Sequence, residues 1–219
     1  MVKFTHGLAL ASMLSMASAT TFNVRIRNLA FLQPFSPPLV VAHTRVSEDV
    51  ALFKEGLPAS DAIKLMAEDG DNSALLELAA SEEVAPYICG AAVAEGPLFL
   101  GDTLRLVLEV DDKICPRPVI SLVGMLINTN DAFVGIDSAP LELGSTKLFP
   151  PAFDAGTEIN NELCNSLPGP ACPMDSGNVQ NVPGEGYVHI SRGFHGVGDL
   201  LEARYDWRNP VAEVFIASQ

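Results

Sequence analysis

The sequence has few basic residues and no apolar stretch long enough to cross a membrane. It holds 13 lysines and arginines against 27 acidic residues, which gives a formal net charge of -14. Such an acidic surface repels nucleic acid and anionic lipid, so we expect no nucleic-acid partner. No segment approaches the roughly 20 uninterrupted apolar residues of a transmembrane helix. We therefore expect no transmembrane segment, and divalent cations are the more natural partners of the acidic side chains.

Motifs of the common catalytic and cofactor-binding classes are also missing. The chain contains no Gly-x-Ser-x-Gly elbow of a serine hydrolase, no glycine-rich phosphate loop, and no Cys-x-x-Cys pair of a zinc or redox site. It also lacks an Asn-x-Ser/Thr site for glycosylation. These absences favour a binding protein, and we expect that the protein is not an enzyme.

The chain begins with a pattern typical of a secretory signal peptide. Lys3 is followed by an uncharged apolar run that ends in the small-residue sequence ASA. We therefore expect residues 1–19 to be removed and residues 20–219 to be secreted into the extracellular space. No internal repeat or low-complexity linker divides the mature chain, so a single domain is expected.

Four cysteines, an even number in a chain expected to be exported, predict two disulfide bonds. Four cysteines allow three pairings. The proline-glycine loop between Cys164 and Cys172 lets the chain double back and favours that pair. Cys89 and Cys115 are then left to pair with each other.

Short strands account for most of the predicted secondary structure. In TFNVRIRN, apolar Phe22, Val24 and Ile26 alternate with polar residues, which is the period of a half-buried strand. Further strands are predicted, in chain order, at LVVAHTR, LRLVLEV, VISLVGML, AFVGID, YVHIS, LLEARYDW and AEVFIA.

Two short helices are predicted between the second and third of these strands. Ser60 is placed to cap DAIKLMAE, and Ser73 is placed to cap ALLELAASEE. The strands do not alternate with long helices, so a parallel sheet is not expected. The sequence predicts a mainly β protein, an antiparallel β-sandwich with a small helical insert near residues 59–84.

Two acidic segments stand beside stretches that are expected to be buried. NTNDAFVGID places Asp131 directly before an apolar strand, and FDAGTE places Asp154 and Glu158 around a glycine that permits a tight bend. Carboxylates crowded at the edge of a core are costly unless a positive charge compensates them. Calcium is held by about six to eight oxygens, many of them from carboxylates in loops. These acids are therefore candidate metal ligands, the alternative being that they are solvated or cap their loops.

The chain resembles the spondin domain, in a short secreted single-domain form. The resemblance is carried by NVRIRNL, QPFSPPLVVAHT, MAEDGDN, SLVGMLINTNDAFVGIDS, FDAGTEINNE and DWRNPVAEV, and it covers residues 20–219 in order. It implies a β-sandwich with one calcium ion held by Asp131, Asp154 and Glu158. Glu158 replaces an aspartate of the family pattern. The resemblance also implies a role in extracellular binding or adhesion, with an unknown extracellular protein or carbohydrate as partner.

Histidine and aromatic residues near the C-terminus leave other functions open. His189 and His195 in HISRGFHG can form a metal pair or an acid-base pair in a secreted metal-dependent enzyme, or they can simply pack. Tyr205 and Trp207 can stack on carbohydrate, although such a pair near a last strand is more often part of the core. A third possibility is an assembly component whose calcium is purely structural.

Overall fold

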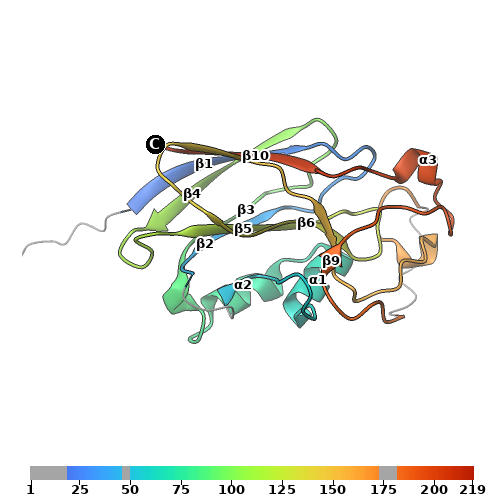
Figure 1. Cartoon of the computed structure of the whole chain (residues 1–219), viewed down its shortest axis with the longest axis horizontal. Coiled ribbons are helices and arrows are strands. Elements are labelled where there is room, and N and C mark those ends of the chain that lie inside the picture. The colour runs from blue at the N-terminus through green and yellow to red at the C-terminus, as the bar shows by residue number, and fades with distance from the viewer. Residues whose placement is uncertain (1–18, 46–49, 173–181) are drawn as a thin grey trace, which may run out of the picture.

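Two antiparallel sheets lie face to face, as Figure 1 shows edge-on. The computed structural model describes residues 19–45, 50–172 and 182–219. The four-stranded sheet has the order β4 (Thr103–Asp111), β1 (Ala19–Asn28), β10 (Ala212–Ser218) and β7 (Ser145–Leu148). The six-stranded sheet has the order β3 (Ile88–Val93), β2 (Leu39–His43), β5 (Val119–Met125), β6 (Ala132–Pro140), β8 (Ala152–Asp154) and β9 (His189–Ile190). The predicted antiparallel β-sandwich is confirmed. The predicted signal peptide lies outside the described residues except for its last residue, Ala19.

A helical layer covers the outer face of the six-stranded sheet (Figure 1), and it confirms the predicted insert. It contains α1 (Asp61–Asp69), α2 (Ser73–Ala80) and the 3-10 turn η2 (Ala85–Tyr87). The predicted cap of α1 is confirmed, because Ser60 Oγ accepts from Ile63 N at 3.2 Å. The predicted cap of α2 is wrong: Ser73 is the first helical residue, and its own N–H donates to Asp71 Oδ1 at 2.8 Å.

The central strand β5 is buried along its whole length because both faces of its sheet are covered. Ile120 and Leu122 face the other sheet, whereas Val123 and Met125 face the helical layer. This explains why the β5 sequence is almost continuously apolar instead of alternating. Residues of the opposite sheet complete the inter-sheet core, among them Phe22, Val24, Ile26, Leu108, Val110, Val214 and Ile216.

Both disulfide bonds form with the predicted pairing. Cys89 in β3 bonds to Cys115, which follows β4, across a sequence separation of 26. Cys164 and Cys172 close the short loop that begins with the 3-10 turn η3 (Cys164–Ser166). The first bond joins the edge strand β3 of one sheet to the segment that follows β4 of the other, and the second holds a loop beyond the strands.

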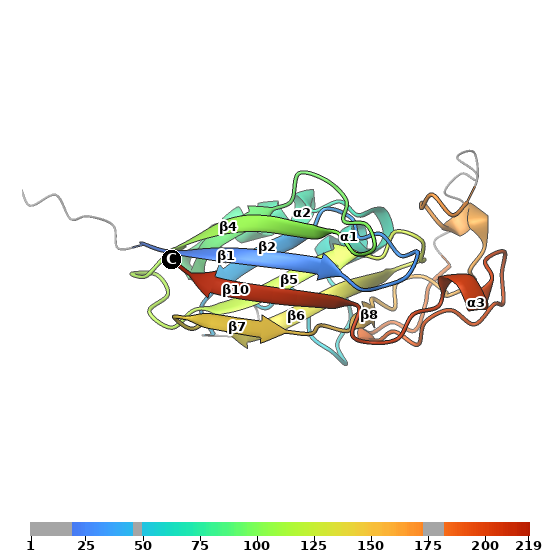
Figure 2. The same ribbon diagram turned by 90° about the horizontal axis from the view of Figure 1, so that it is seen from above.

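The segment after residue 182 differs most from the sequence prediction. The predicted strand LLEARYDW, residues 200–207, is wrong: it contains the short helix α3 (Glu202–Tyr205), in which Tyr205 N donates to Leu201 O at 3.0 Å. The predicted strand YVHIS is reduced to the two residues of β9. Figure 2 shows α3 at one end of the sandwich, beyond the strands of the four-stranded sheet. The backbone of this segment bonds locally, since Arg204 N and Tyr205 N both donate to Leu201 O.

Glycine in β6 allows aromatic rings to close over the sheet. A Cβ added at Gly135 would lie 2.7 Å from Phe153 Cδ2 and 2.7 Å from Phe53 Cζ, and these two rings already pack with centroids 4.9 Å apart. We expect Gly135→Ala to lower the free energy of unfolding by about 1–3 kcal/mol through overpacking, as measured by chemical denaturation. At Gly96 a Cβ would meet no heavy atom of the described residues within 4 Å. Gly96→Ala should therefore have little effect, and equal losses in both variants would contradict this packing.

Candidate metal centre

Two buried acidic side chains lie at one end of the strands of the six-stranded sheet, where β6 begins and β8 ends. Asp131 is the residue before β6, and Asp154 is the last residue of β8. Asp154 is the register partner of Ala132, so the two acids are one position apart on neighbouring strands. Asp131 is 0% exposed and Asp154 is 2% exposed. The charge of Asp154 acts on the pKa of Asp131, so the two buried carboxylates are close enough to interact.

Asp131 binds the turn that follows β8 through one of its two oxygens. Its Oδ2 accepts from Thr157 N at 2.7 Å, Glu158 N at 3.0 Å and Thr157 Oγ1 at 3.1 Å. Its Oδ1 is buried and has no hydrogen-bond partner among the described residues. Buried polar atoms are nearly always paired with protein, water or an ion, so this oxygen marks a place where a positive group is expected.

Asp154 is held by its own turn and lies beside β9 and the segment before it. Its Oδ1 accepts from Gly156 N at 2.8 Å, and its Oδ2 accepts from Asn160 Nδ2 at 2.7 Å. His189 Nδ1 lies 3.9 Å from Asp154 Oδ1. Ligating atoms of Asp154, Glu185 and His189 all lie within 4.8 Å of one another. This group, in which Asp154 is buried, His189 is half-buried and Glu185 is exposed, can hold a metal ion.

Two glycines allow the segment that carries Glu185 to lie against the turn after Asp154. Gly156 has a φ of 67°, and a Cβ there would lie 2.4 Å from Tyr187 O. A Cβ at Gly184 would lie 2.4 Å from Glu158 O. Any side chain at either position would push the two segments apart, so glycine is required by close approach of the backbones. The glycine of the DAGTE turn is thus explained by packing as well as by its conformation.

Glu158 reaches the same centre through its backbone, while its carboxylate faces α1. Its N–H donates to Asp131 Oδ2, and its side chain is only 4% exposed. The pKa of Glu158 is raised to about 7, first because of burial and then because of the charge of Glu68 in α1. Burial also raises the pKa of Glu68. The acidic cluster therefore extends from the strand ends to the helical layer.

The pKa values of the two central acids show how costly their negative charge is. Burial and then the neighbouring charge of Asp154 raise the pKa of Asp131 from 3.8 to about 8. The pKa of Asp154 is also raised, chiefly by burial, although hydrogen bonds from Asn160 and Gly156 oppose the shift. A cation bound between them would remove the repulsion and favour the ionised form of both.

The structure brings some of the predicted site residues together and separates others. Asp131 and Asp154 lie together, and Glu158 joins them through its N–H. Within the described ranges, the group of ligating side chains contains Asp154 and His189 of the predicted residues, and it does not include Asp131, Glu158 or His195. The N–H of His195 instead donates to Glu162 Oε1 at 2.5 Å, and the His195 side chain is exposed. The two histidines therefore have separate surroundings.

Sequence reasoning missed Glu185 as a member of this group. No metal-binding motif surrounds it, and the sequence places it 31 residues after Asp154. The glycines on either side, Gly184 and Gly186, were the only signal, since they indicate a segment that approaches another backbone closely. Gly186 N donates to Gly156 O at 2.8 Å, which fixes that approach.

Comparisons with known proteins do not identify the domain. No protein-family model matches the sequence, and no curated protein matches it. Membership of the spondin family therefore remains a prediction from the motifs. No helix within the described ranges has both the length and the apolar character to cross a bilayer.

The raised pKa of Asp131 predicts how stability changes with pH when divalent metals are chelated. The unfolded chain loses this proton near pH 3.8, whereas folded Asp131 keeps it up to about pH 8. Its contribution to the free energy of unfolding is therefore full below the lower value and is lost as pH rises through the higher one. We expect the thermal midpoint in chelator to fall between about pH 5 and pH 8.

The variant Asp131→Asn tests the origin of this pH dependence. Its amide oxygen can accept the bonds now made by Asp131 Oδ2, and its NH2 group removes the buried negative charge. The thermal midpoint in chelator should fall less steeply with pH in this variant. Glu158 should supply part of the remaining slope, because its pKa is raised to about 7. An unchanged slope in a folded variant would show that Asp131 does not titrate in this range.

Proposed function

We propose that the protein is a secreted extracellular binding module of the spondin type, with one calcium ion that fixes the loops at one end of its β-sandwich. The observation that carries this proposal is the buried Asp131 Oδ1, which has no donor among the described residues, in an acid whose pKa is raised further by the charge of Asp154. A calcium ion supplies the missing positive charge. The formation of both disulfides fits an oxidising, extracellular compartment.

The proposed ion takes its oxygens from segments that are distant in the sequence. Asp131 and Asp154 are the central ligands. Glu185 offers an oxygen within 4.8 Å of an Asp154 oxygen, and Glu158 is the further acid that the sequence pattern supplies. Calcium accepts six to eight oxygens in irregular arrangements and completes its shell with carbonyls and water. It therefore suits a site built from a strand start, a strand end and two turns. Bound calcium would join the β5–β6 loop to the turn after β8.

A binding role is favoured over catalysis by what surrounds this centre. Glu162, a neighbouring buried acid, uses both carboxylate oxygens to hold the backbone N–H groups of His195 and Val197. Asp206 likewise accepts from Phe194 N at 3.1 Å. These acids organise loops instead of facing a substrate. We therefore propose that the metal shapes a surface for an extracellular protein or carbohydrate, and that the protein is not an enzyme.

His189 supports a second candidate, a site for a transition metal such as zinc. Zinc binds imidazole nitrogen together with carboxylate oxygen, whereas calcium prefers oxygen alone. A zinc ion held by Asp154, Glu185 and His189 would leave one position open for water, as in catalytic zinc sites. The secreted metal-dependent enzyme would then use His189 without His195. A third candidate, an assembly component, requires only a structural calcium ion.

Calcium should stabilise the folded protein by mass action. At a free calcium concentration about 100 times the dissociation constant, the gain is roughly 2.7 kcal/mol. For a domain of this size, that corresponds to a rise of roughly 5–10 °C in the thermal midpoint over the value in chelator. Asp131→Asn and Asp154→Asn should each abolish the rise. Glu142→Gln changes the charge equally at an exposed position beyond the far end of β6, and it should retain the rise. No calcium response in the unaltered protein would refute the proposal.

The variant His189→Gln distinguishes calcium from zinc. If calcium is the natural ion, this variant should keep the calcium-dependent rise, because His189 offers no oxygen ligand. Its response to zinc should fall at least about tenfold in apparent affinity, because an imidazole ligand is lost. Both responses can be measured by thermal unfolding in metal-buffered solutions. A response of the unaltered protein to zinc alone, lost in His189→Gln, would favour the transition-metal site.

A further inference from the structure

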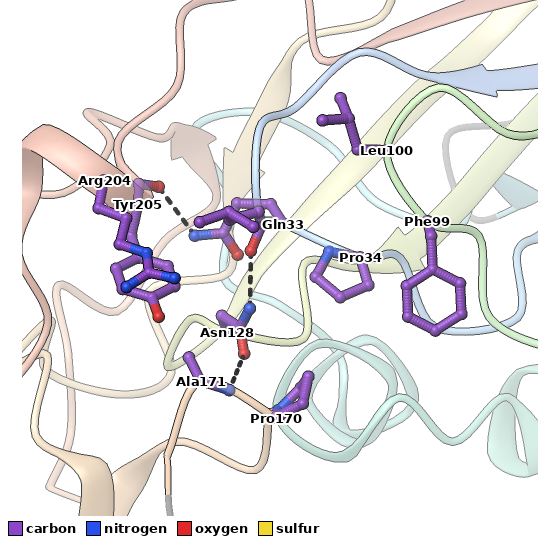
Figure 3. Close-up of a pocket in the computed structure, with 10 residues that line it drawn as sticks. Gln33, Pro34, Phe99, Leu100, Asn128, Pro170, Ala171, Arg204 and Tyr205 are labelled. Atoms are coloured by element: carbon purple, nitrogen blue, oxygen red, sulfur yellow. Dashed lines mark hydrogen bonds between the residues drawn. The ribbon is translucent and has the colours of Figure 1, made fainter.

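A further structural feature lies at the same end of the molecule, apart from the acidic centre. A cavity of about 410 Å³ is formed by residues 32–34 between β1 and β2, residues 99–100 before β4, residues 170–171 and residues 204–205 of α3. Figure 3 shows these residues around the opening. The volume is within the range of small-molecule sites in proteins.

Asn128 of the β5–β6 loop ties two of these segments together. Its Nδ2 donates to Leu32 O at 2.7 Å, and its Oδ1 accepts from Ala171 N at 3.0 Å. Figure 3 shows both hydrogen bonds beneath the opening. The cavity is therefore built by a specific polar side chain and is not an accidental gap between loops.

Gln33 presents an amide oxygen that is held in place without a donor. The residue is 0% exposed, and its Nε2 donates to Tyr205 O at 3.0 Å. The backbone of Gln33 is also fixed, because its carbonyl oxygen accepts from Asn28 Nδ2 at 2.8 Å. In the described chain its Oε1 is buried and has no hydrogen-bond partner. An acceptor left in this state is destabilising, and Gln33 is one of the residues that line the cavity.

The rim combines exposed apolar surface with one cationic group. Phe99 is 52% exposed and Leu100 is 44% exposed, and both line the cavity. On the other side, exposed Arg204 lies over the Tyr205 ring, with its Cζ 5.7 Å from the ring centroid. Figure 3 shows Gln33 between Arg204 and Tyr205 on one side and Pro34 on the other. An acceptor, a cationic donor and an aromatic face thus surround one opening.

The neighbouring aromatic residue Trp207 does not take part in this site. Trp207 is 7% exposed and packs edge-on against Phe194, with ring centroids 5.9 Å apart. It belongs to the core between the sheets. Of the two aromatic residues that the sequence offered for carbohydrate stacking, only Tyr205 reaches the cavity.

We propose that this cavity binds one saccharide ring of a glycan. A pyranose has adjacent hydroxyl groups that each donate and accept, so one can donate to Gln33 Oε1 while its neighbour accepts from Arg204. Its apolar C–H face can pack on the exposed ring of Phe99. Both the mixed polarity and the small volume suit a sugar better than an extended anionic polymer, which the net charge of -14 would repel.

The test is an NMR titration of the secreted, disulfide-bonded protein with methyl glycosides of glucose, galactose, mannose and N-acetylglucosamine. At least one glycoside should give a saturable shift of the Gln33 side-chain amide signal and of the backbone signals of residues 99–100. Analogues of that glycoside that lack one hydroxyl should include one whose affinity is at least about tenfold lower, because Gln33 or Arg204 then loses its partner. The titration is run both with calcium and with chelator, so its outcome is separate from that of the metal proposal.

Exposed phenylalanines supply the matched control for this test. Phe99→Ala should weaken glycoside binding by about fivefold or more, because a stacking face is removed. Phe149 is 53% exposed and does not line the cavity, so Phe149→Ala should bind as the unaltered protein does. Thermal midpoints of the two variants establish that both are folded. The proposal is overturned if no glycoside saturates, if Phe99→Ala binds normally, or if short peptides shift the same signals and glycosides do not.

Discussion

The acidic end of this sandwich depends on two buried carboxylates that strand pairing brings within one position of each other. Asp131 cannot move away from Asp154, because its Oδ2 is tied to the N–H groups of Thr157 and Glu158. The same bonds hold the turn after β8 against the start of β6. These hydrogen bonds stabilise the turn, but they also keep the negative charges of Asp131 and Asp154 close together in a buried place. A bound cation would remove the repulsion between the two charges. The conformation of these loops, the charge of the two acids and the proposed metal binding therefore depend on one another.

The β5–β6 loop connects the acidic centre with the proposed sugar site. Asp131 and Asn128 are three residues apart in this loop. Between them, Thr129 Oγ1 donates to Leu126 O at 2.7 Å and accepts from Ala132 N at 3.0 Å, so the loop has its own internal framework. A rigid sandwich that presents short, cross-linked loops at one end is a common way to build a binding surface. In this arrangement a cation at one side of the loop would stabilise the floor of the cavity at the other.

Strands with strong local patterns were predictable, whereas segments that depend on their neighbours were not. β1 alternates in polarity, and β5 is apolar throughout, so each shows its burial directly in its sequence. The segment at residues 200–207 has an apolar and aromatic composition that suits either structure, and it forms α3, whose N–H groups bond to carbonyl oxygens three or four residues earlier. Ser73 was mistaken for a helix cap because the turn that precedes α2 bonds through Asp71 instead. Such local choices are decided by competing hydrogen bonds.

The sequence by itself determined the β-sandwich with its helical insert, the pairing of the disulfides, and the acidic segments around Asp131 and Asp154. These follow from periodicity, from loop composition and from acids placed beside apolar stretches. Tertiary structure alone decided that Glu185 and His189 join Asp154, that the Glu158 carboxylate faces α1, and that Gln33 lines a cavity with Tyr205. The physical reason is that these contacts join residues far apart in the chain, and strand register and backbone approach at glycines set their distances.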